Sequence, residues 1–142
     1  MVEFYLILAA VTAVSMGVFW RLLIGTVVMV VAGYMGEAGF INTTIGFVVG
    51  MAGWAYILYE IFSGEASKSA ANAKPSVQSA FNTMKWIVTI GWAIYPLGYF
   101  LGYLAGGTDE ATLNIVYNVA DFINKIGFCL AIWAAATTEA DA

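Results

Sequence analysis

Residues 111–133 form one apolar stretch that carries a lysine and an aspartate. At about 1.5 Å per residue, a helix of this length spans roughly 34 Å, enough to cross a hydrocarbon core of about 30 Å. Lys125 lies in the inner half of that span, where a charge is costly and needs a partner. Asp121 stands one turn earlier, in the favourable acid-before-base order. The polar face of this predicted membrane helix continues with Asn114, Tyr117 and Asn118.

The composition extends this interpretation to the whole chain. Hydrophobic residues make up 62% and charged residues 10%, whereas soluble domains carry about 25% charged residues. We therefore expect an all-α transmembrane protein that is not an enzyme. The sequence has no basic patch, which argues against nucleic-acid binding. It also has no histidine, which removes most transition-metal sites and histidine-activated nucleophiles, so no metal site is expected.

Apolar runs separated by short polar segments predict the helices. We expect them at residues 2 to about 14, about 22–38, 44–62, 77 to about 104, and 111–133. Residues 63–76 read as the one substantial aqueous loop, and residues 137–142 as a polar tail. Ser76 and Thr108 are the expected N-caps of the last two helices. The result is four spans plus a helix end, in a single membrane domain covering residues 1–142.

The basic residues orient these spans. Alternate threading puts the helix ends that carry Arg21, Lys68, Lys74 and Lys85 on one side, and the opposite side has no basic residue. The positive-inside rule makes the basic side cytoplasmic. The C-terminus is then cytoplasmic, and Glu3 lies toward the cytoplasmic half.

The pairing of Asp121 with Lys125 has several interpretations. It could be a structural ion pair, an ion or proton relay, or a covalent amine, because a lysine in a low-dielectric site can lose its proton and condense with an aldehyde. The preceding helix favours the covalent amine. One face of it carries large aromatic side chains and a proline, which suit a long apolar ligand: Trp92, Tyr95, Pro96 and Tyr99. The alternative for this face is simple packing between helices.

Glu3 is an acid on an otherwise apolar helix. It either lies at a helix end in contact with water, or is a protonated carboxyl that can hand a proton inward.

The segments Trp92-Ala-Ile-Tyr-Pro96 and Asp121-Phe-Ile-Asn-Lys125 resemble the sixth and seventh helices of microbial rhodopsins. Further segments resemble the proteorhodopsin branch of that family, which consists of bacterial proton pumps: Glu3-Phe-Tyr-Leu-Ile-Leu, Gly33-Tyr-Met-Gly-Glu-Ala-Gly39, Gln78-Ser-Ala-Phe-Asn-Thr-Met84 and Tyr117-Asn-Val-Ala-Asp121. The resemblance covers essentially the whole chain.

The resemblance implies a fold, a cofactor and a set of site residues. The fold would be the end of the third helix and the fourth to seventh helices of a seven-helix bundle. All-trans-retinal would be bound to Lys125 as a Schiff base, with Asp121 in its counterion complex. Glu3 would be the cytoplasmic proton donor. The retinal would contact Trp54, Trp92, Tyr95, Pro96 and Tyr99.

The resemblance also implies a membrane location and partners, and it shows which helices of the family have no counterpart here. The protein would lie in the bacterial inner membrane, with retinal and lipid as partners and a homo-oligomer as an option. The first two helices and most of the third, which carries the primary proton acceptor in the family, have no counterpart here. We therefore expect an incomplete part of an outward proton pump, unable to pump alone.

Other functions remain open at this point. Within the family, the alternatives are a light sensor or a pump for another ion; Glu3 argues against both, because such proteins usually lack a carboxylate there. Outside the family, the alternative is a transporter or helix-bundle subunit in which Asp121 and Lys125 form a structural pair.

Overall fold

The computed structural model describes residues 1–140, with side chains described through residue 138, and this part of the chain contains helices and turns but no strand. Four segments are long and apolar enough to cross a membrane: Met16–Glu37, Thr43–Ala71, Pro75–Leu104 and Glu110–Thr138. The predicted all-α transmembrane fold is therefore confirmed.

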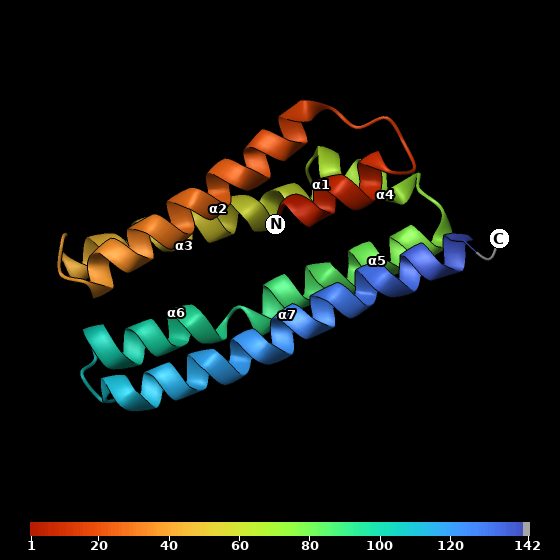
Figure 1. Ribbon diagram of the computed structural model, residues 1–142. Helices are drawn as coiled ribbons and strands as arrows, with labels where there is room; N and C mark the ends of the chain where they lie inside the picture. The colour runs from red at the N-terminus through yellow and green to blue at the C-terminus, as the bar shows by residue number, and fades with distance from the viewer. Residues whose placement is uncertain (141–142) are drawn as a thin grey trace.

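The long helices are arranged as two pairs (Figure 1). In one pair, α2 (Met16–Glu37) packs along α3 (Thr43–Phe62). In the other, α5 (Pro75–Trp86) and α6 (Ile94–Tyr99) follow each other along α7 (Glu110–Ala140). Each pair is an antiparallel hairpin, which is the expected arrangement for helices joined by short loops.

Glycines let α2 and α3 approach closely. A Cβ atom at Gly46 would lie 2.8 Å from the Ala32 carbonyl oxygen and 2.8 Å from the Gly36 Cα atom. Such distances leave no room for any larger residue, so the two backbones touch where membrane helices commonly use small residues.

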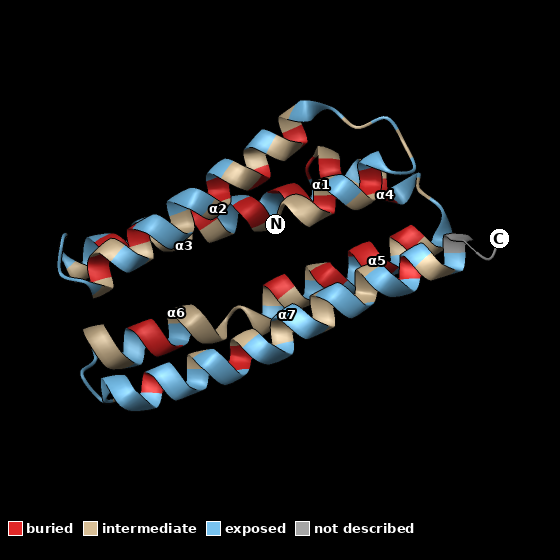
Figure 2. Cartoon of the chain, viewed as in Figure 1, coloured by how far each residue is buried: buried red, intermediate tan, exposed pale blue. Residues whose placement is uncertain are grey.

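Two short helices lie at one end of the bundle. α1 (Val2–Ala9) contacts α2, α5 and α4 (Glu65–Ala71), and so connects the two pairs. Phe4 is fully buried, with its ring edge-on to the rings of Phe81 at 5.0 Å and Phe128 at 5.6 Å between centroids. Most of the buried apolar residues gather around this point, as the buried positions of α1 and α5 in Figure 2 show.

The first two predicted helix boundaries were wrong. α1 ends at Ala9 rather than near residue 14, and α2 begins at Met16 rather than near residue 22. The Ser15 hydroxyl accepts a hydrogen bond from the Gly17 N–H at 3.0 Å and caps α2. Arg21 therefore lies one turn inside the helix, not before it.

The predicted loop at residues 63–76 is also partly wrong, because it contains α4. The Glu60 carboxylate accepts the Ala66 N–H at 3.0 Å and two hydrogen bonds from the Arg21 guanidinium, at 2.9 and 3.3 Å. Arg21 also donates to Glu65 at 2.6 Å. This network satisfies Glu60, whose side chain is 3% exposed, and holds the start of α4 against α2 and α3.

The caps of the last two helices also differ from expectation. α5 begins with Lys74 at its N-cap and Pro75 in its first turn, a favoured place for proline, so Ser76 is inside the helix. At the start of α7, Asp109 takes the place predicted for Thr108: it accepts the Thr112 N–H at 2.9 Å and the Thr112 hydroxyl at 2.6 Å. Residues 137–140 belong to α7, and the rest of the predicted tail lies outside the described residues.

The predicted span at residues 77–104 is one span but not one regular helix. Two π-helical turns, η1 (Ile87–Gly91) and η2 (Phe100–Leu104), flank α6. Figure 1 shows the interruption between α5 and α6. Pro96 lacks an N–H and cannot continue a regular hydrogen-bond pattern, which accounts for part of this irregularity.

Candidate functional site

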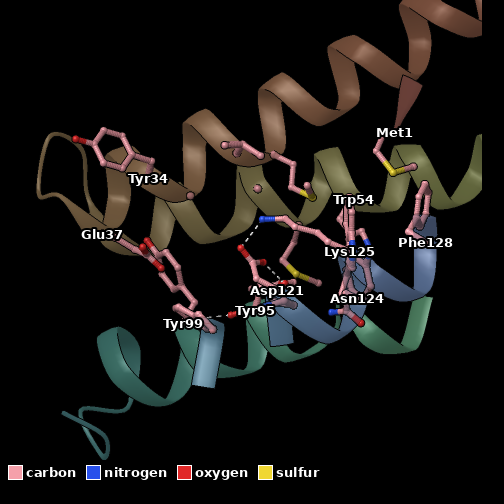
Figure 3. A pocket seen from close by; sticks show the side chains of 18 of the residues that line it. Met1, Tyr34, Glu37, Trp54, Tyr95, Tyr99, Asp121, Asn124, Lys125 and Phe128 are labelled. Atoms are coloured by element: carbon pink, nitrogen blue, oxygen red, sulfur yellow. Dashed lines mark hydrogen bonds and ion pairs between the residues drawn. The ribbon is translucent and has the colours of Figure 1, made fainter. Parts of the chain in front are cut away.

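A cavity of about 700 Å³ lies between the two helix pairs, a volume typical of small-molecule sites. Its walls come from α2 and α3 on one side and from Trp92, α6 and α7 on the other. The cavity is lined by every residue that the sequence singled out for a site: Glu3, Trp54, Trp92, Tyr95, Pro96, Tyr99, Asp121 and Lys125. Figure 3 shows several of them converging from different helices.

The polar centre of the cavity is a chain of three side chains. Lys125 Nζ donates to Asp121 Oδ2 at 2.5 Å, and the Tyr95 hydroxyl donates to Asp121 Oδ1 at 2.5 Å (Figure 3). The two α7 residues are one turn apart, so the helix itself brings them together, whereas Tyr95 comes from α6. The Lys125 side chain is 74% exposed and projects into open space, so its amine is accessible to a ligand.

Aromatic rings form the walls on either side. Trp92, Tyr95 and Tyr99 come from the irregular helix, and Trp54 faces them from α3. Hydrogen bonds to backbone carbonyls hold two of these rings: Trp54 Nε1 donates to Val88 at 3.1 Å and the Tyr99 hydroxyl to Thr43 at 2.9 Å. Indole and phenol groups fixed in this way give an apolar surface with few free polar atoms.

Glu3 reaches the cavity from α1. Its side chain is 45% exposed, and its carboxylate accepts a hydrogen bond from the Met1 amino group at 2.5 Å. Because α1 crosses between the two helix pairs, this acid enters the cavity from the end where the buried core lies.

Only part of the polar face predicted for α7 lies in the cavity. Tyr117 lines it, and its hydroxyl donates to the Tyr95 carbonyl at 3.2 Å. Asn114 and Asn118 are exposed and lie outside it. Asn124, which the sequence analysis did not single out, lines the cavity and donates to the Gly91 carbonyl at 3.0 Å. An amide inside an apolar span was the signal that could have identified it.

The side chains that line the cavity can be tested against a ligand. They include the Lys125 amine, the Asp121 carboxylate beside it, and facing aromatic rings. An amine can condense with an aldehyde, the adjacent carboxylate can balance the positive charge of the product, and the rings can enclose a long conjugated chain. The residues therefore fit an apolar polyene aldehyde such as retinal.

Comparisons with known proteins agree with this geometry. A family model described as bacteriorhodopsin-like protein matches residues 1–139. The green-light absorbing proteorhodopsin of Gamma-proteobacterium EBAC31A08 is 52% identical, over 96% of this chain and 55% of that protein. The blue-light absorbing proteorhodopsin of Gamma-proteobacterium Hot 75m4 is 51% identical, over 97% of this chain and 56% of that protein.

A solved structure is similar as well. The crystal structure of the blue light-absorbing proteorhodopsin from Med12 matches with a TM-score of 0.78 and 51% identity, over 97% of this chain and 60% of that one. This chain spans about half the length of the curated relatives it matches. A family model matched through residue 139 and relatives more than 50% identical lead to one conclusion: this chain belongs to the bacteriorhodopsin-like family of microbial rhodopsins.

Proposed function

We propose that this chain is part of a light-driven outward proton pump that carries all-trans-retinal on Lys125. The observation that carries the proposal is the Lys125–Asp121 pair, which lies in an aromatic cavity of about 700 Å³. The two proteorhodopsins that are 51% and 52% identical to this chain support it, because each is named for light absorption.

Lys125 is the proposed attachment point. The Lys125 amine would hold retinal through a C=N bond to its aldehyde carbon, with release of water, and the bound retinal would supply the absorption of visible light. Its 74% exposed side chain leaves the amine accessible for that condensation. Trp54, Trp92, Tyr95, Pro96 and Tyr99 are the proposed walls around the polyene.

Asp121 is proposed as a member of the counterion complex. Its two oxygens have separate partners, Oδ2 on Lys125 and Oδ1 on the Tyr95 hydroxyl. Tyr95 therefore fixes the direction of the carboxylate and keeps its charge beside the amine nitrogen. A carboxylate held by two partners can keep a positive charge inside an apolar span.

Glu3 is proposed as the proton donor to the same nitrogen. It lies on α1, at the end of the cavity that adjoins the buried core, and comes from a different helix than Asp121. With carboxyl groups on two different helices, Glu3 would supply the proton to the nitrogen, and Asp121 would balance the positive charge of that nitrogen.

The proposed setting is the bacterial inner membrane with the C-terminus in the cytoplasm. The end of α7 lies at the same end of the bundle as α4 and the start of α5 (Figure 1), where Lys68 and Lys74 occur. The positive-inside rule favours the cytoplasm for that end.

Reconstitution with retinal tests the attachment. The full native reading frame that contains this sequence would be expressed with all-trans-retinal, beside the Lys125→Ala and Lys85→Ala variants. We expect a visible absorption band in the wild type and in Lys85→Ala, and none in Lys125→Ala. Borohydride reduction should place a retinyl mass on the Lys125 peptide. A wild type without a band would leave the Asp121–Lys125 pair structural and overturn the proposal.

Light-driven pH changes test the pump. Illuminated cells or liposomes should show outward acidification that a protonophore abolishes, and Glu3→Gln should slow recovery of the resting absorption in a way that added azide reverses. Alkalinisation of the medium that depends on sodium or chloride, and that a protonophore increases, would instead assign another ion. A normal band with no pH change would favour a light sensor.

A further inference from the structure

The backbone is irregular beside the cavity where η1 leads into α6. The Trp92 N–H donates five residues back, to the Ile87 carbonyl at 3.0 Å, and the Tyr95 N–H donates three residues back, to the Trp92 carbonyl at 3.1 Å. A regular helix would send the Tyr95 N–H to the Gly91 carbonyl, four residues back. The Gly91 carbonyl therefore lacks its usual donor, and such a group is costly inside a membrane.

A side chain from the neighbouring helix supplies the missing donor. Asn124 Nδ2 donates to the Gly91 carbonyl at 3.0 Å. On the other side of the same π-helical turn, Trp54 Nε1 donates to the Val88 carbonyl at 3.1 Å. The turn η1 is thus held from α7 and from α3, by two side chains that both line the cavity.

The contact between Asn124 and Gly91 is close. A Cβ atom at Gly91 would lie 2.2 Å from Asn124 Oδ1, 3.0 Å from its Cγ and 3.3 Å from its Nδ2, and these are the three nearest atoms. Any larger residue at this position would therefore displace the amide and break the hydrogen bond. Gly91 is the residue that lets the amide reach the backbone.

The two bonded residues are each followed directly by a residue of the proposed chromophore site. Gly91 precedes the ring residue Trp92, and Asn124 precedes the amine residue Lys125. A hydrogen bond between the first members of these two pairs fixes the spacing of the second members, because backbone positions one residue apart move together.

We propose that Asn124 is a positioning residue that clamps the π-helical turn η1 to α7 and so sets the placement of Trp92 relative to Lys125. This inference rests on the proposed retinal function, because the spacing matters only for a ligand held between the two. It goes beyond the proposed function because it names the two residues, Asn124 and Gly91, that set the spacing between Trp92 and Lys125.

A double-mutant cycle tests the clamp. The full native reading frame, loaded with all-trans-retinal, would be compared as wild type, Asn124→Ala, Gly91→Ala and the double variant. Asn118→Ala is the matched control, since Asn118 is on the same helix, is exposed and makes no side-chain hydrogen bond within the described residues. The readouts are the absorption maximum, the rate at which hydroxylamine bleaches the band in the dark, and the thermal midpoint.

We expect Asn124→Ala to shift the absorption maximum and to speed bleaching several-fold, and Asn118→Ala to change neither. Gly91→Ala should have a larger effect, because it both breaks the bond and displaces the amide. The double variant should return to the values of Asn124→Ala, since removing the amide removes the clash.

Three results would overturn the clamp while leaving the retinal function intact. They are a normal absorption maximum and bleaching rate in Asn124→Ala, a change in thermal midpoint without any change in the band, or additive effects of the two substitutions. A wild type without a retinal band would overturn the proposed function itself, and with it the positioning role. The two failures are therefore distinguishable.

Discussion

The space between the helix pairs is filled at one end and hollow at the other. At the end where α1 and α4 lie, large apolar side chains fill it and are at most 2% exposed: Phe4, Leu8, Ile61, Phe81 and Met84. At the other end the same space is the cavity, where the side chains of Lys125 and Asp121 are 74% and 42% exposed. Figure 2 shows more buried positions on α1 and α5 than on α7, which is mostly exposed along its length.

α1 accounts for the filled end, because its residues Phe4 and Leu8 occupy the space between the pairs there. The Lys125–Asp121 pair lies away from this packing, in the cavity. Under the proposed function, substitutions at the two ends should therefore affect stability and the retinal spectrum separately.

The largest effect on stability is expected at the filled end. Phe4→Ala removes a ring that contacts Phe81 and Phe128, and should lower the free energy of unfolding by about 3–5 kcal/mol. The absorption maximum of the retinal-loaded protein should stay unchanged. The measurements are the thermal midpoint and the absorption spectrum. Leu6→Ala is the control, because Leu6 is 57% exposed. A spectral shift in Phe4→Ala would break the separation of the two ends.

The ion network at the filled end should have the next largest effect. Glu60→Gln leaves Arg21 with only Glu65 and weakens the bond to the Ala66 N–H, so it should cost about 1–3 kcal/mol. Glu65→Gln is the matched control, because Glu65 is 43% exposed and such pairs contribute about 1 kcal/mol or less. Chemical unfolding measures both, and equal losses would contradict a buried role for Glu60.

A substitution in the cavity should change the spectrum more than the stability. Tyr95→Phe removes the hydrogen bond to Asp121 and should cost about 1–2 kcal/mol. It should also shift the absorption maximum, since the carboxylate beside Lys125 loses one of its two partners. Tyr59→Phe, at a 62% exposed position outside the cavity, should do neither. An unshifted Tyr95→Phe spectrum would remove Tyr95 from the counterion complex.

The smallest effect is expected at Asp109, before α7. The Thr112 hydroxyl and N–H both donate to this carboxylate and hold its pKa below the usual value. A lowered pKa means that its contribution to stability is present above the unfolded pKa of about 4 and is lost as the pH falls through the folded pKa.

Asp109→Asn keeps the cap but removes that titration. The difference in thermal midpoint between wild type and Asp109→Asn should therefore shrink between about pH 6 and pH 3. A difference that stays constant over this range would show that the charge of Asp109 contributes nothing. The absorption maximum should be the same in both proteins.

Much of the architecture could be predicted from local patterns. The span at residues 44–62 agrees with α3 within one residue, because a long apolar run between Asn42 and Ser63 leaves little choice. The meeting of Asp121 with Lys125 follows from helical spacing alone. The aromatic residues between Trp92 and Tyr99 do line one cavity, although the helix that carries them is not regular.

Other features depended on partners far away in the sequence. Residues 65–71 look like loop by composition, yet they form α4, because Glu60 caps its start and Ala66 and Ala70 are buried against neighbouring helices. The end of α1 at Ala9 could not be predicted from the sequence either, because the apolar run continues beyond it.

Sequence by itself therefore determined the membrane class, the number of spans and the identity of the amine and carboxylate, because each depends on length or on spacing within one helix. The tertiary structure decided where the cavity lies, which end is filled by Phe4, and that Asn124 reaches Gly91. Those features arise between helices that are distant in the chain, where packing and unsatisfied backbone groups, rather than local preference, select the arrangement.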